Sequence, residues 1–418
     1  MGLPVSTVPP DETQGRADDV FLRPEDAASK SSNDAREDDS AIEASDATVS
    51  ADAPAALQGH SADGAPLDDD TGRRLHEVGR CLFSVGQFQS AQTWFERAAG
   101  SKEQGPGIDR VDYESVGASQ HQVGECLLAI GQFETALTWF ERAAAAKEKG
   151  DTIGRVDYES LGRSLHQAGY CLSAAGKFDT ARAWFEYSVA AAEKGDAAGR
   201  VDYESLGSSL HQVGYCLSAV RQFDAARPWF ERAVAAAEKG DVNGRVNRAS
   251  LGRSMHQVGY CLSAAGQIDA GRPWLESAIA AAEAGDLDGR IDYEGLGCTF
   301  HLIGCCLSSA QQFESARPWF ERAVEASERG DAHGRIDYES VGSSLHQVGY
   351  CLSMLGRFDL AIDWFKRAVA TKEKGDNFGR VDDASLSISR RAEIVCRRRL
   401  EAPDEALSNE VKALYSPA

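Results

Sequence analysis

Two columns of side chains recur along this chain at a fixed interval, and both consist of residue types that can bind metals. Seven of the nine histidines lie 45 residues apart, from His76 to His346. Eight of the ten cysteines keep the same interval, from Cys81 to Cys396. Imidazole nitrogen and thiolate sulfur are ligands that zinc prefers. The first question is therefore whether the two columns form metal sites.

The spacing within one repeat argues against a shared metal ion. His211 and Cys216 are five residues apart, and at about 100° per residue they point about 140° apart around a helix. Packed helices lie about 8–10 Å apart, which is too far for zinc bonds of about 2.0–2.3 Å between neighbouring repeats. A disulfide would need Cα atoms within about 7 Å. We expect no metal site, and we interpret the cysteines as small buried apolar residues.

Other chemistry is equally poorly matched. The segment from Asp286 to Glu294 resembles half of a calcium loop, but aligning Gly289 with the sixth loop position places Ala284 and Gly295 where carboxylates are required. The chain has no Ser/His/Asp order, phosphate-binding glycine loop or HExxH motif. A residue repeated seven times is also a poor catalytic candidate, because active sites are asymmetric. The sequence predicts no enzyme activity, no catalytic residue and no cofactor.

Composition argues against further classes of protein. The 418 residues carry 44 basic and 65 acidic side chains, a net charge of −21, whereas nucleic-acid binding depends on clustered Lys and Arg. No window approaches the ~18 consecutive apolar residues of a membrane span. Ten cysteines are too dilute for a disulfide scaffold. We expect a cytoplasmic protein that neither binds nucleic acid nor spans a membrane.

The negative charge is concentrated at the N-terminus. Residues 1–72 contain 17 acidic and 4 basic side chains, and Phe21 is their only aromatic residue. A segment this polar buries too little apolar area to offset the entropy of ordering its backbone. We expect residues 1–70 to form a disordered acidic tail.

From residue 73 onward the sequence repeats itself seven times without an insertion or deletion. All seven tryptophans keep the 45-residue interval, from Trp94 to Trp364, and so do the arginines from Arg110 to Arg380. Such a period is typical of stacked units, none of which can bury a core alone.

Each repeat contains two amphipathic stretches of helical period. In the fourth repeat, Leu206, Leu210, Val213 and Leu217 form one apolar stripe, and Asp202 precedes it as a natural N-cap. A second stripe runs from Phe223 to Ala237 and ends at a Lys-Gly-Asp step, in which the glycine is placed as a C-cap.

Two features of the second stripe carry predictions of their own. Trp229 lies between apolar neighbours, so we interpret the tryptophan column as part of the core. Pro228, Pro273 and Pro318 lie early in this stripe, where proline is tolerated only in the first turn. We therefore expect these helices to start late or to bend.

These residues resemble the tetratricopeptide repeat (TPR), a helical hairpin with a characteristic order of small and large apolar residues. The matching residues of the fourth repeat are Val213, Gly214, Leu217, Phe223, Ala226, Phe230 and Ala233. The Glu-Lys-Gly-Asp linker is similar to that of the longer TPRs of kinesin light chains and G-protein-regulator scaffolds, although the usual TPR period is about 34 residues.

The resemblance implies an all-α fold, a right-handed α-solenoid of seven TPR-like helical hairpins over residues 71–382. Residues 383–418 lose the histidine and the glycine of the repeat and gain five arginines between Arg390 and Arg399. Because a solenoid needs a terminal helix with one polar face, we expect a C-terminal capping helix there, followed by a short tail helix from Asp404 to Tyr415.

The resemblance also places the first helix of each hairpin on the concave groove of the superhelix. The peptide-binding residues that it implies are His121, His166, His211, His256, His301, His346, Tyr170, Tyr215, Tyr260, Tyr350, Arg163 and Arg253. Such a groove suits an extended or helical peptide, which it contacts through aromatic area and hydrogen bonds. Hydrogen bonding between repeats, with no ligand, explains the same polar ladder equally well.

The sequence thus predicts a protein-interaction scaffold that binds a protein or peptide segment in the concave groove. The alternative is a structural or self-associating spacer that uses the convex Glu-Arg face, for example Glu231-Arg232 and Glu321-Arg322, with no groove ligand. A third hypothesis, a sensor tuned by the histidines near about pH 6–7, depends only on the ordinary titration range of imidazole.

Overall fold

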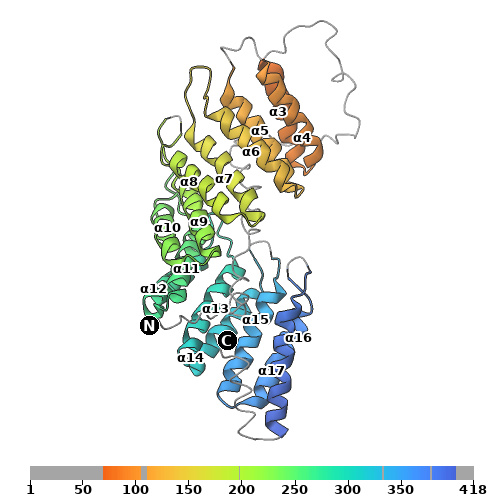
Figure 1. The fold of residues 1–418 in the computed structure, drawn as a ribbon, viewed down its shortest axis with the longest axis vertical. Coiled ribbons are helices and arrows are strands. Elements are labelled where there is room, and N and C mark those ends of the chain that lie inside the picture. The colour runs from red at the N-terminus through yellow and green to blue at the C-terminus, as the bar shows by residue number, and fades with distance from the viewer. Residues whose placement is uncertain (1–68, 105–110, 197, 332–333, 377–378, 402–418) are drawn as a thin grey trace, which may run out of the picture. The chain divides into compact units, whose positions relative to one another are not determined.

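The computed structural model describes residues 69–104, 111–196, 198–331, 334–376 and 379–401. Fifteen helices and no strand lie within these ranges (Figure 1). The predicted disordered tail lies outside the described residues except for its last two, which begin the first described helix. The predicted tail helix, Asp404 to Tyr415, also lies outside them.

The helices alternate as the first and second members of seven hairpins. The first helices are α3 (Asp69–Ser84), α5 (Tyr113–Ala129), α7 (Tyr158–Ala174), α9 (Tyr203–Ala219), α11 (Arg248–Ala264), α13 (Tyr293–Ser309) and α15 (Tyr338–Met354). The second helices are α4 (Phe88–Glu103), α6 (Phe133–Lys147), α8 (Phe178–Ala192), α10 (Phe223–Ala237), α12 (Ile268–Glu283), α14 (Phe313–Ser327) and α16 (Phe358–Lys372). A final helix, α17 (Asp383–Glu401), follows the seventh hairpin.

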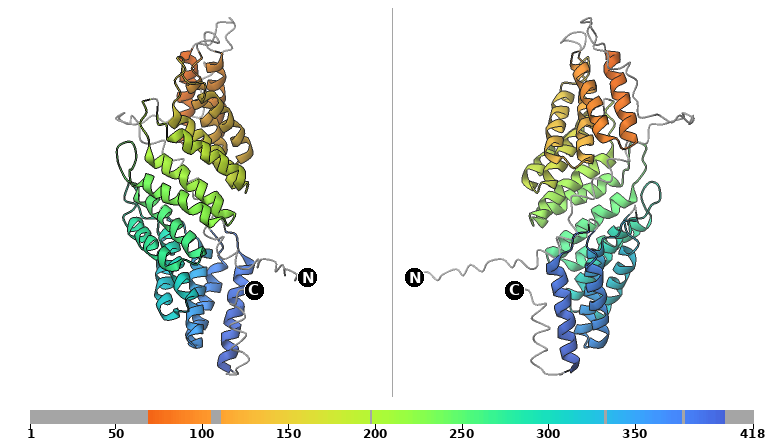
Figure 2. Two further views of the ribbon diagram at one scale, coloured as in Figure 1. Left: turned by 60° about the vertical axis from the view of Figure 1, so that its left-hand side comes forward. Right: turned by 90° about the vertical axis from the view of Figure 1, so that its right-hand side faces the viewer.

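The chain forms two compact units whose boundary falls between Cys216 and Leu217, inside α9. In the N-terminal unit the second helix of one hairpin packs against the first helix of the next, as α4 packs against α5 and α6 against α7. The C-terminal unit repeats this order with α10 against α11 and α14 against α15 (Figures 1 and 2). The predicted all-α solenoid of TPR-like hairpins is confirmed, because neighbouring hairpins build their core jointly.

Local signals define the ends of the helices as the sequence predicts. The backbone N–H of Glu204 donates to the Oδ1 atom of Asp202 at 3.1 Å, so Asp202 caps α9. After the second helices, Gly150 and Gly240 have φ angles of 78° and 80°. A Cβ atom at either position would lie 2.5 Å from a backbone carbonyl oxygen, so only glycine fits these C-caps.

Each described linker of the Gly-Asp-x-x-Gly-Arg type closes on itself through an Asp–Arg pair. The backbone N–H groups of Ile153 and Arg155 both donate to Oδ1 of Asp151 at 2.9 Å, and the Arg155 guanidinium donates to Oδ2. These hydrogen bonds lower the pKa of Asp151. The oxygens that a calcium ion would require are therefore already occupied within the loop.

The tightest packing inside a hairpin joins a glycine of the first helix to a phenylalanine of the second. Phe140 is fully buried, and a Cβ atom on Gly124 would lie 2.6 Å from its ring. Trp139, by contrast, is only partly buried at the edge of the same cluster. The Arg142 guanidinium lies 5.0 Å from its ring centroid. The prediction of a buried tryptophan column is therefore wrong in part, since phenylalanine fills the core and tryptophan closes its rim.

Of the two outcomes predicted for the proline-containing helices, the late start is wrong, and the bend stays a prediction. Helix α10 begins at Phe223, as the 45-residue register requires, although Pro228 lies in its second turn. Pro228 and Asp224 are both exposed. The carbonyl group that loses its N–H partner at this proline therefore faces water, which can satisfy it.

Seven of the eight periodic cysteines are buried, as predicted, and all ten cysteines are free thiols. Cys81 is the exposed member, because it lies in the first described hairpin and no earlier hairpin among the described residues covers it. Burial raises the pKa of the Cys126 and Cys351 thiols to about 12. These thiols are therefore protonated at neutral pH.

Helix α17 departs from the side-chain pattern of the earlier first helices. Its Leu386 and Cys396 are buried, as at the corresponding positions of earlier first helices. At the position where α15 has Gly349 against Phe365, α17 has Ile394, which is 49% exposed. An isoleucine at that position would prevent a second helix from packing in the usual way.

The turn inside each hairpin generates a first prediction about stability. Five hairpins place glycine there with positive φ, whereas Arg221 and Gln311 adopt φ of 60° at the same position. A left-handed conformation costs a non-glycine residue about 1–2 kcal/mol. We predict that Gln311→Gly raises the free energy of unfolding by about 1 kcal/mol, measured by urea denaturation.

The matched control is Gly356→Gln. Nothing lies within 4 Å of a Cβ atom at Gly356, so this change should lower stability by about the same amount through φ alone. Equal stability of both variants and the wild type would show that positive φ at this turn costs a glutamine residue nothing.

Candidate functional site

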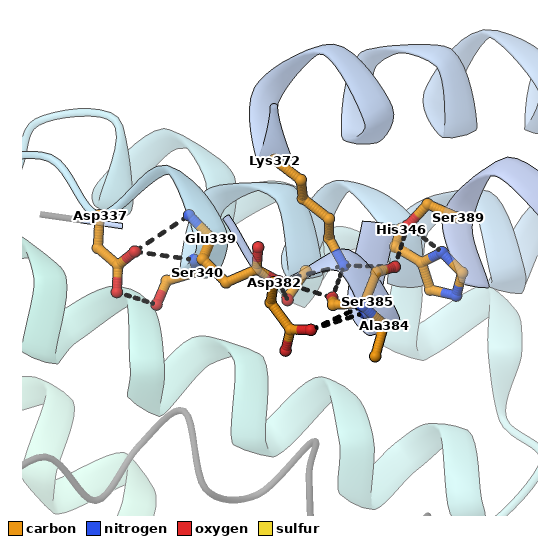
Figure 3. Close-up of polar contacts among 10 residues, drawn as sticks. Asp337, Glu339, Ser340, His346, Lys372, Asp382, Ala384, Ser385 and Ser389 are labelled. Atoms are coloured by element: carbon orange, nitrogen blue, oxygen red, sulfur yellow. Dashed lines mark hydrogen bonds and ion pairs between the residues drawn. The ribbon is translucent and has the colours of Figure 1, made fainter. Parts of the chain in front are cut away.

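The predicted histidine row lies where one first helix meets the next. The Nδ1 atom of His121 lies 3.1 Å from the Ser164 Oγ atom, and that of His301 lies 2.9 Å from the Ser344 Oγ atom. Four further contacts of this kind, each spanning 43 residues, are His76–Ser119, His166–Ser209, His256–Thr299 and His346–Ser389 (the last in Figure 3). The histidines therefore connect one hairpin to the next within each unit.

Five of these six rings also pack against the core phenylalanine of their own hairpin. The hairpin of His256 has Leu275 in place of that phenylalanine. The ring centroids of His121 and Phe140 lie 5.2 Å apart at an interplanar angle of 63°. The remaining exposed surface is small, since His301 and His346 are each 7% exposed. His211 lies half-buried in α9. A ligand on this side can reach only the edges of the imidazoles.

Burial changes the acid–base behaviour of the row. It lowers the pKa of His76, His256 and His301 to about 4. Desolvation is the main cause, because it disfavours the charged imidazolium. These three imidazoles are therefore neutral at physiological pH, which argues against a sensor that titrates near pH 6–7 at these three positions.

The predicted tyrosine row is packed against the preceding hairpin. Tyr170, Tyr215 and Tyr260 are 4%, 7% and 9% exposed, and Tyr350 is half-buried. The Tyr260 ring lies 5.6 Å from that of Phe223, edge to face at 87°. Such aromatic pairs stabilise the contact between hairpins by about 0.5–1.5 kcal/mol each. Most of the tyrosine surface is thus unavailable to a ligand.

The two predicted arginines are more accessible. Arg163 is exposed, and Arg253 is half-exposed with its Nη2 atom 3.4 Å from the Ser250 Oγ atom. Arg253 also lines a hollow of about 20 Å³. The equivalent positions of the other hairpins hold Arg73, which is exposed, and Ala118, Ser208, Cys298 and Ser343, which are partly exposed. This row therefore changes chemically from hairpin to hairpin, while the buried rows around it change less.

Sequence reasoning missed a set of buried lysines. Lys147 is 2% exposed, and its Nζ atom donates to the Ser160 carbonyl oxygen at 2.9 Å and to the Ser164 Oγ atom at 3.0 Å. Burial lowers the pKa of Lys147 to about 7. The sequence signal is a lysine in a position where the middle hairpins have Ala192, Ala237 and Ala282.

Ser164 lies between Lys147 and His121. A nucleophilic serine with a base on each side would have the same arrangement. Ser164, however, is 0% exposed. No substrate can reach its hydroxyl in this arrangement, so the three groups are best explained as structural partners.

A second buried lysine joins the last three helices (Figure 3). The Lys372 Nζ atom contacts the Ser385 Oγ atom of α17 and lies 3.4 Å from the Glu339 carboxylate of α15. Ser385 in turn donates to Glu339 at 2.6 Å. Both charged side chains are almost fully buried, and removing one partner from such a pair typically costs about 3–5 kcal/mol.

A cleft of about 640 Å³ lies in the N-terminal unit, between α4, α5 and α6. Its lining includes Gln120, which is 6% exposed. The Gln120 Nε2 atom donates to the Glu103 carboxylate at 2.9 Å, whereas its Oε1 atom has no hydrogen-bond partner. None of the twelve predicted groove residues lines this cleft.

Within the described parts of the chain, no three side chains among His, Cys, Asp and Glu converge as a metal site would require. No helix in those parts is long and apolar enough to cross a membrane.

The histidine row generates a second prediction. Between pH 6.5 and about 4 the unfolded chain binds a proton at His76, His256 and His301 that the folded chain does not. These histidines therefore make stability fall as the pH is lowered through this window. The pKa of His256 sets an upper limit of about 3 kcal/mol for that residue, at about 1.4 kcal/mol per pKa unit. We predict this loss in urea denaturation at pH 7 and pH 4.5.

The variant His256→Gln separates histidine from carboxylate titration, because it removes one imidazole and keeps a hydrogen-bonding group. Its stability should depend less steeply on pH than that of the wild type. Parallel profiles for the two proteins would show that His256 titrates normally.

Comparisons with known proteins agree with this architecture. A family model described as tetratricopeptide repeat matches residues 299–329, which extend from α13 through α14. A putative kinesin light chain with nearly identical TPR-like repeats from Podosopora anserina is 24% identical, with a TM-score of 0.39, and the match covers 52% of this chain and 96% of that chain. No curated protein matches the sequence.

Two other solved structures are similar over longer stretches. BtubC (BKLC) from P. vanneervenii is 14% identical, with a TM-score of 0.47, over 58% of this chain and 89% of that chain. The apo form of the quorum sensor NprR from B. thuringiensis is 9% identical, with a TM-score of 0.52, over 82% of this chain and 85% of that chain. At this identity, the last likeness is one of fold alone.

Proposed function

We propose that this chain, which is built of tetratricopeptide-like repeats, is a non-enzymatic scaffold that binds a protein or peptide segment. The supporting observation is the contrast between its buried and exposed rows. The histidines and tyrosines recur because they hold the hairpins together, whereas the exposed row of Arg163 and Arg253 changes chemically along the array. Variable side chains presented at regular intervals on a constant framework are suited to selective binding of an extended partner.

The binding side in this proposal is the first-helix side, which the TPR resemblance places in the concave groove. Arg163 and Arg253 make the main polar contacts there, and the imidazole edges of His121, His166, His211, His256, His301 and His346 border them. Guanidinium groups bind carboxylate and backbone carbonyl groups through several parallel hydrogen bonds. The tyrosines Tyr170, Tyr215, Tyr260 and Tyr350 support this surface from beneath.

The alternative, self-association through the convex Glu-Arg face, has less support. The Arg232 guanidinium lies 4.7 Å from the centroid of the Trp229 ring, and Glu231 lies 3.7 Å from Arg227 of the same helix. These side chains have partners within their own hairpin. Light scattering across a concentration series distinguishes the two hypotheses, because a concentration-independent monomer is incompatible with a self-associating spacer.

The third prediction tests the binding side directly. A partner captured by the full chain is identified and purified, and its affinity is measured calorimetrically for the wild type and for Arg163→Glu and Arg253→Glu. We predict that at least one charge reversal weakens binding about tenfold, which corresponds to about 1.4 kcal/mol. Helicity should be unchanged, because neither arginine is buried.

Arg232→Glu is the matched control, since it reverses the charge of an exposed arginine on a second helix. It should leave the affinity within about twofold of the wild type. Weaker binding by this control alone would assign the partner to the second helices and overturn the proposed side.

A further inference from the structure

We propose that the cleft between α4, α5 and α6 binds an arginine side chain presented by a partner protein. The partner depends on the scaffold function proposed above, but the cleft contains none of the residues assigned to the first-helix side. The two sites can therefore be tested separately.

The cleft arises from three departures from the repeat at one junction between hairpins. Gly100 stands where the next second helix has Ala145, and Val116 stands where the next first helix has Leu161. Gln120 occupies a position that holds a large apolar residue in each of the other six hairpins, as at Leu165. At the next junction Leu161 and Leu165 are buried together in an apolar cluster. The first junction therefore lacks the apolar volume that fills its neighbour.

Gln120 leaves an unsatisfied acceptor in this space. Its Nε2 atom donates to the Glu103 carboxylate at 2.9 Å, and this bond defines the orientation of the amide, because a carboxylate can only accept. The Oε1 atom is buried without a partner. An unpaired buried acceptor costs about 1–3 kcal/mol, so a ligand that supplies an N–H group recovers that energy.

The surrounding groups match a planar cation. Glu96 and Glu103 supply carboxylates on α4, while Tyr113 and Trp139 supply aromatic rings on α5 and α6. A guanidinium group has five N–H donors in one plane, so it can donate to an amide oxygen and a carboxylate at the same time. An ammonium group offers no such plane.

The two basic side chains that line the cleft, Arg142 and Lys149, lie over aromatic rings. The Arg142 guanidinium carbon lies 5.0 Å from the Trp139 ring centroid, and the Lys149 ammonium lies 4.5 Å from that of Tyr113. Both side chains are exposed, whereas the free Gln120 oxygen is buried. The net charge of −21 for the whole chain adds a long-range attraction for a basic segment.

The fourth prediction uses the full chain and a defined probe. The probe is the acetylated and amidated peptide Gly-Ala-Arg-Ala-Gly, compared with the same peptide containing citrulline, which keeps the shape and removes the charge. We predict that the arginine peptide binds at least about tenfold more tightly than the citrulline peptide, a difference typical of a charge-assisted hydrogen bond. Titrations followed by calorimetry or amide NMR measure both affinities.

Two variants locate the binding. Gln120→Leu restores the residue of the next hairpin, so it should fold at least as stably as the wild type and lose binding at least about tenfold. Glu103→Gln preserves the shape of the cleft and should reduce the preference for arginine over citrulline. The matched control is Glu148→Gln, at the equivalent position of the next hairpin and outside the cleft lining, which should bind like the wild type.

Several outcomes overturn the proposal. These are equal binding by wild type and Gln120→Leu, equal affinity for the arginine and citrulline peptides, and no saturable binding by the wild type. Binding that appears only in Arg110→Ala would show that the chain's own linker arginine occupies the cleft instead of a partner. If the peptide binds as predicted while Arg163 and Arg253 have no effect on partner affinity, the first-helix proposal fails and the cleft stands.

Discussion

The contact between consecutive hairpins is the interaction on which the rest of this structure depends. A hairpin forms one close contact of its own between a glycine and a large apolar side chain, as between Gly124 and Phe140 or Gly259 and Leu275. Its first helix, however, is covered only when the neighbouring hairpin is present. The covering surface is both apolar and polar: tyrosine packs on phenylalanine, and histidine bonds to a serine or threonine 43 residues later. A hydrogen bond in this position favours one register between neighbouring hairpins, because a shifted hairpin would leave two buried polar groups unpaired.

This constraint determines which residues remain available for binding. The recurring histidines and tyrosines are largely buried between hairpins, so the recurrence of a residue marks its role in assembly. Positions that vary from hairpin to hairpin are the better guide to function, and they include both the exposed Arg163–Arg253 row and the cleft around Gln120. The buried lysines illustrate the same logic at the ends of the array. There Lys147 and Lys372 replace the small residues of the middle hairpins and donate to groups of the next helix.

Local features were predictable from the sequence, and features that depend on the distance between hairpins were not. The helices, the Asp202 cap and the C-terminal glycines follow from patterns within a few residues. The burial and hydrogen bonding of the histidines depend on how closely two first helices approach each other. The sequence of one repeat does not show that distance. Trp139 and Phe140 lie on the same apolar stripe, and only the glycine opposite Phe140 decides which ring is fully buried. The cleft was detectable in principle, because Gln120 interrupts a column of large apolar residues.

A hairpin of this kind should be stable only in contact with its neighbours, and circular dichroism of the isolated segment 113–157 measures that dependence. This segment contains α5, α6 and the closing Asp–Arg linker, so every contact internal to one hairpin is present. We expect a monomeric peptide with little helix at 25 °C, whereas residues 69–401 as a whole give the strong signal of an α-helical protein. A monomeric 113–157 segment that is fully helical and unfolds cooperatively would show that a hairpin is stable without its neighbours.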